Sequence, residues 1–433
     1  MSATTNKLNY AAVPPRASSS RALRNEVVPS NGSSFTANST IIFDLPSNVP
    51  NTFFDTHSSY VSMLVTNGDG HDVFFSSNGF PCAIRRMVIE LGGQTLFSLD
   101  HYGELFSAMM DLDAAADYKD NAGKVLFGSS SGFKGHQLQE AGNAAESRRV
   151  CFPLFLTPLM ANKYFPSPMS RDRMRIRLEM DTAARGFIAE DAALTDAQVI
   201  FSDVKFVQYN LELGADVMSQ VAAAAGGSFK IACPSYQHHQ ASIAAAASSI
   251  SPTLGFSMSS LNRLLILQQL QAVTATNETI GNRSYMDLER VSVNIGGVKY
   301  PQLDIKISAG ATTGAPEALA EALISQRSLT SVSQVTSINS CGDSVVSYTL
   351  DEVVGNNAAN TGKFLLDIDL ESQRAGANPE SQLVAGVNTI GAVVQAKLDY
   401  AAAITAAHVI NFYGEHTILL MLDLNTLTFS IAV

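Results

Sequence analysis

The side chains that could bind a metal ion lie far apart in this chain of 433 residues. His238 and His239 are adjacent, and adjacent side chains on a strand point to opposite faces, so the two rings cannot bind one metal ion together. His57 lies near Asp55, and His101 lies at the start of a helical pattern, but neither has further ligands at the spacing of a zinc site. The sequence therefore predicts neither a metal ion nor a cofactor.

Patterns that would indicate catalysis are equally weak. Residues 128–132 (Gly-Ser-Ser-Ser-Gly) lack the lysine and the following helix of a phosphate-binding loop, and we interpret them as a flexible loop. Glu90 and Glu179 lie in runs that alternate apolar and polar residues, which is typical of solvent-facing positions on a strand. Because a glycoside hydrolase needs two carboxylates at a set separation in space, a hydrolase stays open as an alternative. A carbohydrate-binding β-sandwich is the other alternative, although the chain has no tryptophan for a sugar platform. We expect a protein that is not an enzyme.

The composition points to extensive buried contacts. Apolar residues make up 46% of the chain and charged residues only 15%, against about 25% charged in ordinary soluble proteins. A stable globular protein and a protein with large subunit contacts both fit this composition. The four cysteines form no Cys-x-x-Cys pair, and the chain starts with no apolar signal, so we expect free thiols and assembly inside a cell without export.

The first 38 residues differ from the rest of the chain. They are rich in serine, asparagine, proline and alanine, without the periodicity of a helix or strand, and we predict a flexible N-terminal arm over residues 1–38. The arm carries Lys7, Arg16, Arg21 and Arg24 against Glu26 alone, so its net charge is +3. The whole chain has a net charge of −11, so the rest of the chain, the body, carries −14. A body of that charge excludes sequence-specific nucleic-acid binding, so the arm is the part that could contact an anionic partner.

The rest of the chain consists mainly of short alternating runs separated by turn residues, which predicts antiparallel strands. Helices are expected at 101–112, with Asp100 as the N-cap, at 214–225 and at 315–327, and a polar insertion at 113–147. The paired glycines 92–93 predict a tight hairpin. The expected strands are 39–45, 60–66, 82–91, 94–99, 148–156, 173–181 and 198–213, then 229–232, 262–272, 290–295, 363–370, 392–400 and 417–433.

The two halves of the body resemble each other. Residues 86–93 (RMVIELGG) match residues 290–297 (RVSVNIGG), with alternating apolar residues that run into a double-glycine turn. Four such matches have offsets that rise steadily along the chain, at 201, 204, 212 and 218 residues, and they start at Ser58, Arg86, Phe152 and Ile176. A steady rise is what a duplicated domain with lengthened loops would give. We predict an all-β protein of two tandem eight-stranded jelly rolls with a few short helices in the connections, over residues 39–225 and 226–433.

The segment 39–65 (STIIFDLPSNVPNTFFDTHSSYVSMLV), followed by 82–106 (CAIRRMVIELGGQTLFSLDHYGELF), resembles the opening of double jelly-roll major capsid proteins of the adenovirus and tectivirus lineage, which includes polinton-like viruses and small tailless phages. The resemblance covers roughly residues 39–112, and the duplicated layout extends it over most of the chain.

This resemblance implies a major capsid protein of the virion. Three chains would form a homotrimer, a pseudo-hexameric capsomer that tiles an icosahedral shell beside neighbouring capsomers, penton proteins and minor capsid proteins. The basic arm, with Lys7, Arg16, Arg21 and Arg24, would lie on the inner side and contact neighbours, an inner membrane or the genome. We expect that deleting residues 1–38 leaves the trimer folded but impairs closure of the shell.

Overall fold

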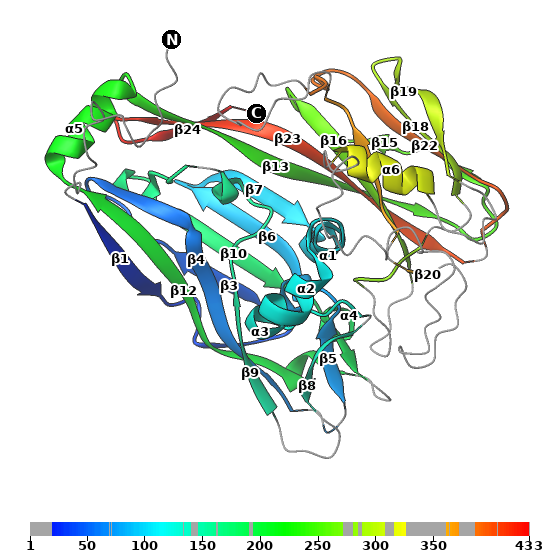
Figure 1. Ribbon diagram of the computed structural model, residues 1–433, viewed down its shortest axis with the longest axis horizontal. Coiled ribbons are helices and arrows are strands. Elements are labelled where there is room, and N and C mark those ends of the chain that lie inside the picture. Colours follow the sequence, from blue (N-terminus) through cyan, green and yellow to red (C-terminus); the bar gives the residue numbers. More distant parts are fainter. Residues whose placement is uncertain are drawn as a thin grey trace, which may run out of the picture.

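The structure is a computed structural model, and two β-sandwich halves lie side by side in it (Figure 1). It describes residues 20–68, 70, 72–132, 134–139, 146–161, 163–189, 194–271, 280–284, 288–307, 316–325, 361–362, 364–371, 386–404 and 406–432. Among these residues no helix is long and apolar enough to cross a bilayer.

The first half is built from a five-stranded and a four-stranded antiparallel sheet that face each other. One sheet has the order β1 (Ser20–Val27), β12 (Val199–Leu213), β4 (Thr52–Asn67) and β9 (Glu146–Phe152), and β2 (Ser34–Thr36) also pairs with β12. The other has the order β3 (Thr40–Asp44), β10 (Met174–Met180), β6 (Ile84–Leu91) and β7 (Gln94–Asp100). Phe43 of β3 contacts Phe206 of β12 across the core, with ring centroids 6.0 Å apart. A small third sheet contains β11 (Phe187–Ala189), β5 (Val73–Ser76) and β8 (Lys134–Gln139).

The second half repeats this arrangement. Its first sheet has the order β13 (Ser228–Ile243), β23 (His408–Asp423), β16 (Leu261–Leu270) and β21 (Leu366–Asp369), and β24 (Phe429–Ala432) pairs with β23. Its second sheet has the order β14 (Ser249–Ile250), β22 (Val394–Tyr400), β18 (Leu288–Ile295) and β19 (Val298–Lys306), and β15 (Thr253–Leu254) also pairs with β22. β17 (Arg283–Ser284) and β20 (Thr361–Gly362) form a separate pair.

The strand orders show that the predicted duplication is real. β1, β12, β4 and β9 occupy the positions of β13, β23, β16 and β21, and β3, β10, β6 and β7 occupy those of β14–β15, β22, β18 and β19. The hairpin glycines repeat as well: φ is 59° at Gly92 and 82° at Gly93, and 58° at Gly296 and 87° at Gly297. Two successive positive φ angles define the tight turn that double glycine predicts. The fold is therefore a tandem pair of jelly rolls.

The registers correct two of the sequence matches. Leu91 pairs with Met174, and its counterpart Ile295 pairs with Val394, so Val394 corresponds to Met174 and not to Ile176. The strands were matched correctly, but the alignment was two residues off, which keeps the same side chains facing the core.

The other correction concerns Phe152. It pairs with Val61, whereas the counterpart of Val61, Asn262, accepts a backbone hydrogen bond from Leu370. Leu370, not Phe364, therefore corresponds to Phe152.

The helices lie in the connections between strands. The longer ones are α1 (Tyr102–Asp113), α5 (Ala215–Ala224) and α6 (Pro316–Ser325), close to the three predicted helices. Asp100 is not the N-cap of α1: His101 takes that position in a left-handed conformation, with φ at 55°. The shorter helices are η2 (Phe80–Ala83), α2 (Ala116–Tyr118), η3 (Lys119–Gly123), α3 (Lys124–Phe127), η4 (Pro158–Met160), η5 (Ser167–Met169), α4 (Ala183–Gly186) and η6 (Asp196–Gln198).

The N-terminal arm that the sequence predicts over residues 1–38 is too long. Residues 20–38 belong to the first sheet, because β1 pairs with β12 along its whole length and β2 pairs with the other end of β12. The burial of β1 explains why the sequence did not reveal it: the strand lies at a sheet edge, and six of its eight side chains are exposed, so apolar and polar residues do not alternate. The first jelly roll thus begins at β1, and residues 1–19 lie outside the described part.

The predicted polar insertion at 113–147 is not a plain loop. Its described residues form α2, η3, α3 and β8, and they pack beside α1. Lys119 and Phe127 are fully buried there, and they anchor the described part of this glycine-rich segment to the first domain.

Candidate functional site: the interdomain seam

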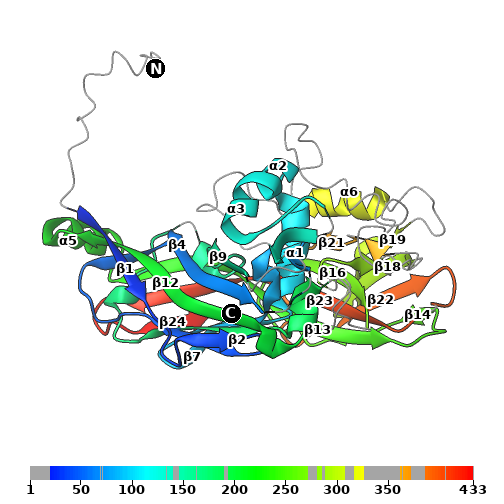
Figure 2. The same cartoon turned by 90° about the horizontal axis from the view of Figure 1, so that it is seen from below.

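The two jelly rolls meet at α1, which follows β7 and lies against the second half (Figure 2). Eleven of the twelve α1 residues are buried, including the polar residues Glu104, Ser107 and Asp111. A surface helix exposes one face, so burial on all sides means that both domains cover this helix. We call the contact between α1 with its preceding His101 and the sheet β13-β23-β16-β21 the interdomain seam.

The strand β16 shows how the second domain forms its side of the seam. Leu265 and Leu267 belong to the same apolar cluster as the core of the first domain, whereas Leu264 and Ile266 belong to the core of the second. Alternate side chains point to opposite faces of a sheet, so this strand is apolar on both faces. Residues 264–267 accordingly form a continuous apolar run, as is typical of a strand buried on both sides.

Asp111 is the centre of the first of three polar networks in the seam. Lys119 Nζ lies 2.6 Å from its Oδ1, and a guanidinium nitrogen of Arg283 lies 2.5 Å from its Oδ2. Asn78 donates to the same carboxylate at 3.1 Å, and Arg283 also donates to the Phe364 carbonyl at 3.0 Å. Since Arg283 belongs to the second half, this network joins the two jelly rolls through fully buried charges.

Arg263 of β16 is the centre of the second network. Its guanidinium lies 2.5 Å from Glu415 and 3.2 Å from Asp367, and it donates to the Tyr236 hydroxyl at 3.3 Å. It also reaches the Met109 sulfur on α1 at 3.8 Å. One guanidinium faces two carboxylates here, and burial raises the pKa of Asp367 to about 7 although Arg263 opposes the shift.

The third network contains two histidines in contact, His101 and His238, whose rings are tilted by 42° with their centroids 4.8 Å apart. His101 Nδ1 lies 2.9 Å from Glu104, and His238 Nε2 lies 3.1 Å from Asn411. The Tyr413 hydroxyl donates to the His101 carbonyl at 2.8 Å. Burial lowers the pKa of each histidine to about 4, so both rings are neutral at physiological pH.

Arg185 completes the first domain's side of this network. It forms ion pairs with Glu104 and, at 3.1 Å, with Asp181. Burial raises the pKa of Asp181 to about 6. The three networks together place ion pairs and hydrogen bonds inside an otherwise apolar contact between the two domains.

The residues that the sequence raised as catalytic candidates are not brought together. Glu90 pairs with Arg177 at 2.8 Å, and Glu179 pairs with Arg85 at 3.2 Å, so each carboxylate is engaged by its own arginine. Among the described residues no group of three or more histidine, cysteine, aspartate or glutamate side chains could hold a metal ion.

The serine-rich loop 128–132 also matches the spacing Gly-x-Ser-x-Gly, with Ser130 at its centre. A nucleophile elbow lies between a strand and a helix, whereas this loop follows α3 and precedes β8. Ser130 donates its backbone N–H to the Ser77 carbonyl at 2.8 Å, and Ser129 is fully buried. The loop therefore packs within the first domain and presents no activated nucleophile.

The arginines of the predicted arm are paired within the sheet. Arg21 lies 2.7 Å from Glu212, and Arg24 lies 2.7 Å from Glu26, whose carboxylate also pairs with Lys205 at 3.2 Å. Arg21 and Arg24 are thus surface residues of β1 and not part of a flexible arm, which corrects their predicted placement, whereas their contact with neighbours, a membrane or the genome stays a prediction. Lys7 and Arg16 lie outside the described residues.

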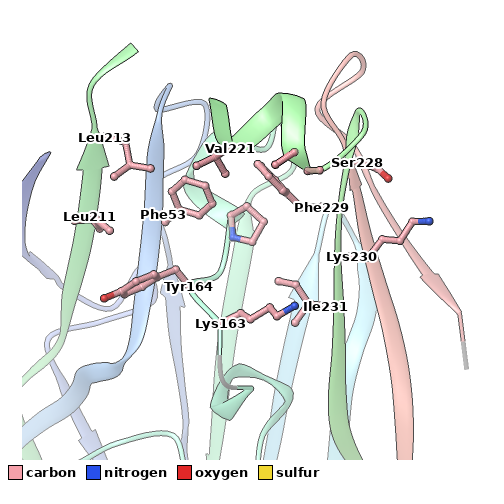
Figure 3. Close-up of a pocket in the computed structure, with 13 residues that line it drawn as sticks. Phe53, Lys163, Tyr164, Leu211, Leu213, Val221, Ser228, Phe229, Lys230 and Ile231 are labelled. Atoms are coloured by element: carbon pink, nitrogen blue, oxygen red, sulfur yellow. The ribbon is translucent and has the colours of Figure 1, made fainter. Parts of the chain in front are cut away.

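An apolar groove lies below α5 (Figure 3), which is at one end of the molecule and away from α1 (Figure 1). Its volume is about 610 Å³. β12 forms one side and the start of β13 the other, with Phe53 and Phe229 between them at a ring distance of 5.6 Å. Tyr164 lines the groove and is 53% exposed, so an aromatic face is open to solvent.

Sequence reasoning did not find the seam. Arg263 gave a signal, because it is a charged residue inside the apolar run 261–267, and such a residue needs a buried partner. Arg283 gave none, since it lies among polar residues, and only the fold places it against Asp111.

No protein-family profile matches the chain, and no curated protein matches it by sequence. Solved structures are similar over nearly its whole length. The PBCV-1 virus capsid aligns with a TM-score of 0.62 at 12% identity, over 98% of this chain and 99% of that one. The Sputnik virophage structure aligns with a TM-score of 0.59 at 9% identity, over 100% and 93%, and the Faustovirus major capsid protein with 0.59 at 9%, over 95% and 92%. At these identities the comparison establishes the fold.

Proposed function

We propose that this chain is a major capsid protein, structural rather than catalytic, whose copies associate into a trimer of six jelly rolls that tiles an icosahedral virion shell. The observation that carries the proposal is the strand-for-strand duplication of both sheets, with a buried seam between the duplicates. The similarity in fold to virus capsid structures over nearly the full length supports the same function.

The duplication gives each chain a second set of surfaces that correspond to the two sides of the seam, and in the described part of the chain these two do not face each other. α6 follows β19 as α1 follows β7, and Glu317 in its first turn is exposed. The sheet β1-β12-β4-β9 corresponds to the sheet that covers α1. Its outer face carries Arg149, which is 43% exposed, and Lys205, which is 25% exposed.

These two surfaces, α6 and the outer face of the sheet β1-β12-β4-β9, differ from each other. Each can therefore bind the other surface on a second copy, but it cannot bind its own equivalent there. A contact of this kind is head to tail, and it closes into a ring if the rotation between copies allows it. Three chains with two similar domains each give six nearly equivalent sides, which suits hexagonal packing. In this arrangement the start of α6, with Glu317, meets the outer face of the first sheet of the next copy, where Arg149 and Lys205 lie beside Asp203 and Glu26.

Neighbouring trimers, penton proteins and minor capsid proteins are the further partners that we propose. Lys7 and Arg16 remain the residues of the N-terminal segment that could contact an inner membrane or the genome. The virion is the corresponding location.

Native mass spectrometry of the purified chain tests the proposal, with a particle of three times the 46.1 kDa chain mass as the expected result. Negative-stain images should show hexagonal blocks. The double variant Arg149→Glu, Lys205→Glu should weaken the trimer, and Arg175→Glu, on the outer face of the other sheet, should not. A stable monomer at micromolar concentration would contradict the proposed assembly.

A further inference from the structure

The groove below α5 has the form of a binding site for a short peptide. Its lining includes three aromatic side chains, Phe53, Tyr164 and Phe229, and the aliphatic residues Leu211 and Leu213 on β12. Grooves lined by aromatic side chains bind proline-rich segments, because such segments are already extended and lose little entropy on binding. An open apolar surface of this kind on a soluble protein marks a contact site.

The chain brings a matching segment to this groove. Ser20, the first described residue, pairs with Leu213, which lines the groove, so residues 1–19 join the fold at its edge. Within them, residues 8–15 (LNYAAVPP) contain no charged side chain and end in two prolines. The prolines hold their own φ near −65° and favour an extended conformation at the preceding residue.

The distances and charges agree with this placement. Pro15 precedes Ser20 by five residues, which span about 16 Å when extended, so the uncharged segment reaches the groove from its own chain. The charged side chains of the groove are Lys163 and Lys230. Their positive charge would repel Lys7 and Arg16, the two charges that flank the segment, so the charges favour the uncharged segment alone as the occupant of the groove.

We propose that residues 8–15 bind in the groove below α5 of the same chain. The short tether gives the segment an effective concentration of about 1 mM, so even a weak affinity keeps it bound. The groove then anchors the N-terminal segment and leaves residues 1–7 to project from this end of the molecule.

The chain has no tryptophan, so a single introduced one reports on the groove without background. In Tyr164→Trp the emission of the full-length protein should be blue-shifted and poorly quenched by acrylamide. Deleting residues 2–16 should shift it to the red and increase quenching, and Val13→Asp should do the same. Ala3→Asp, outside the segment, should have no effect, and neither should the deletion in Val298→Trp, whose side chain lies on β19.

An unchanged emission after the deletion would overturn the proposal. So would recovery of blue-shifted emission when the truncated Tyr164→Trp chain is mixed with full-length chain that lacks tryptophan, because another copy would then fill the groove. The emission responds to the groove whether or not trimers form, and native mass spectrometry reports on trimers separately.

Discussion

The guanidinium of Arg283 lies 2.5 Å from the carboxylate of Asp111, and both side chains are completely buried. One residue comes from α1 of the first jelly roll and the other from the second jelly roll, 172 positions later. The pair therefore ties the stability of the two domains together. Lys119, also fully buried, depends on the same carboxylate.

We predict that Asp111→Ala lowers the free energy of unfolding by about 3–5 kcal/mol, because it leaves two buried cations without their carboxylate. Urea unfolding monitored by circular dichroism measures the change. The matched control is Glu289→Ala, which removes an exposed pair with Arg290 and should cost less than about 1 kcal/mol. Equal effects of the two substitutions would contradict the importance of the buried network.

The raised pKa of Asp367, about 7, predicts a pH dependence of stability. The native state keeps a proton that the unfolded chain, with an ordinary aspartate pKa near 4, releases. Between about pH 4 and pH 7 the native state therefore binds more protons, and its stability falls as the pH rises. Asp367→Asn should remove this contribution, so melting temperature across this range should fall less steeply with pH than in the wild type. If melting temperature depended on pH in the same way in the wild type and in Asp367→Asn, the carboxyl group of Asp367 would not cause the pH dependence.

The buried histidines have the opposite effect on stability, which they lower as the pH falls. His238 has a native pKa near 4, below the ordinary value of about 6.5, so the unfolded chain takes up a proton that the native state does not. This contribution to stability is complete above pH 6.5 and is lost as the pH falls from about 6.5 to 4. His238→Gln should reduce the loss of melting temperature on acidification. His57 is exposed on β4 and provides the control as His57→Gln, which should follow the wild type.

Two truncations distinguish the N-terminal segment from the first sheet. Deleting residues 1–19 should leave the trimer intact and lower the melting temperature much less than the longer deletion, because the described sheets stay complete and only the proposed groove contact is lost. Deleting residues 1–38, which we first expected to be harmless to the fold, should destabilise the protein, since it removes β1 and β2 and exposes the edge of β12. Shell assembly of the shorter truncation, measured as particle yield, then tests the proposed contacts of Lys7 and Arg16. Unchanged yield would contradict them.

The alternation of apolar residues and the double glycines at 92–93 and 296–297 predicted the two jelly rolls, because these features are local in the sequence. Strand lengths were predicted less well. The strand expected at 229–232 extends to Ile243 as β13, since its later residues pack polar side chains such as His238 into the seam. The edge strand β1 and the partners of Asp111 could not be predicted, because both depend on contacts between segments that are far apart in the sequence.

The burial of α1 also determines when the first domain can be finished during synthesis. Ribosomes add about 5–20 residues per second, so Arg283 is made about 10–30 s after Asp111. Until then the Asp111 carboxylate lacks Arg283 as its partner. The side of α1 that the second jelly roll later covers stays exposed to water and to chaperones. During this interval of translation the first domain of the nascent chain lacks its contact with the second domain, and the uncovered side of α1 can bind other proteins.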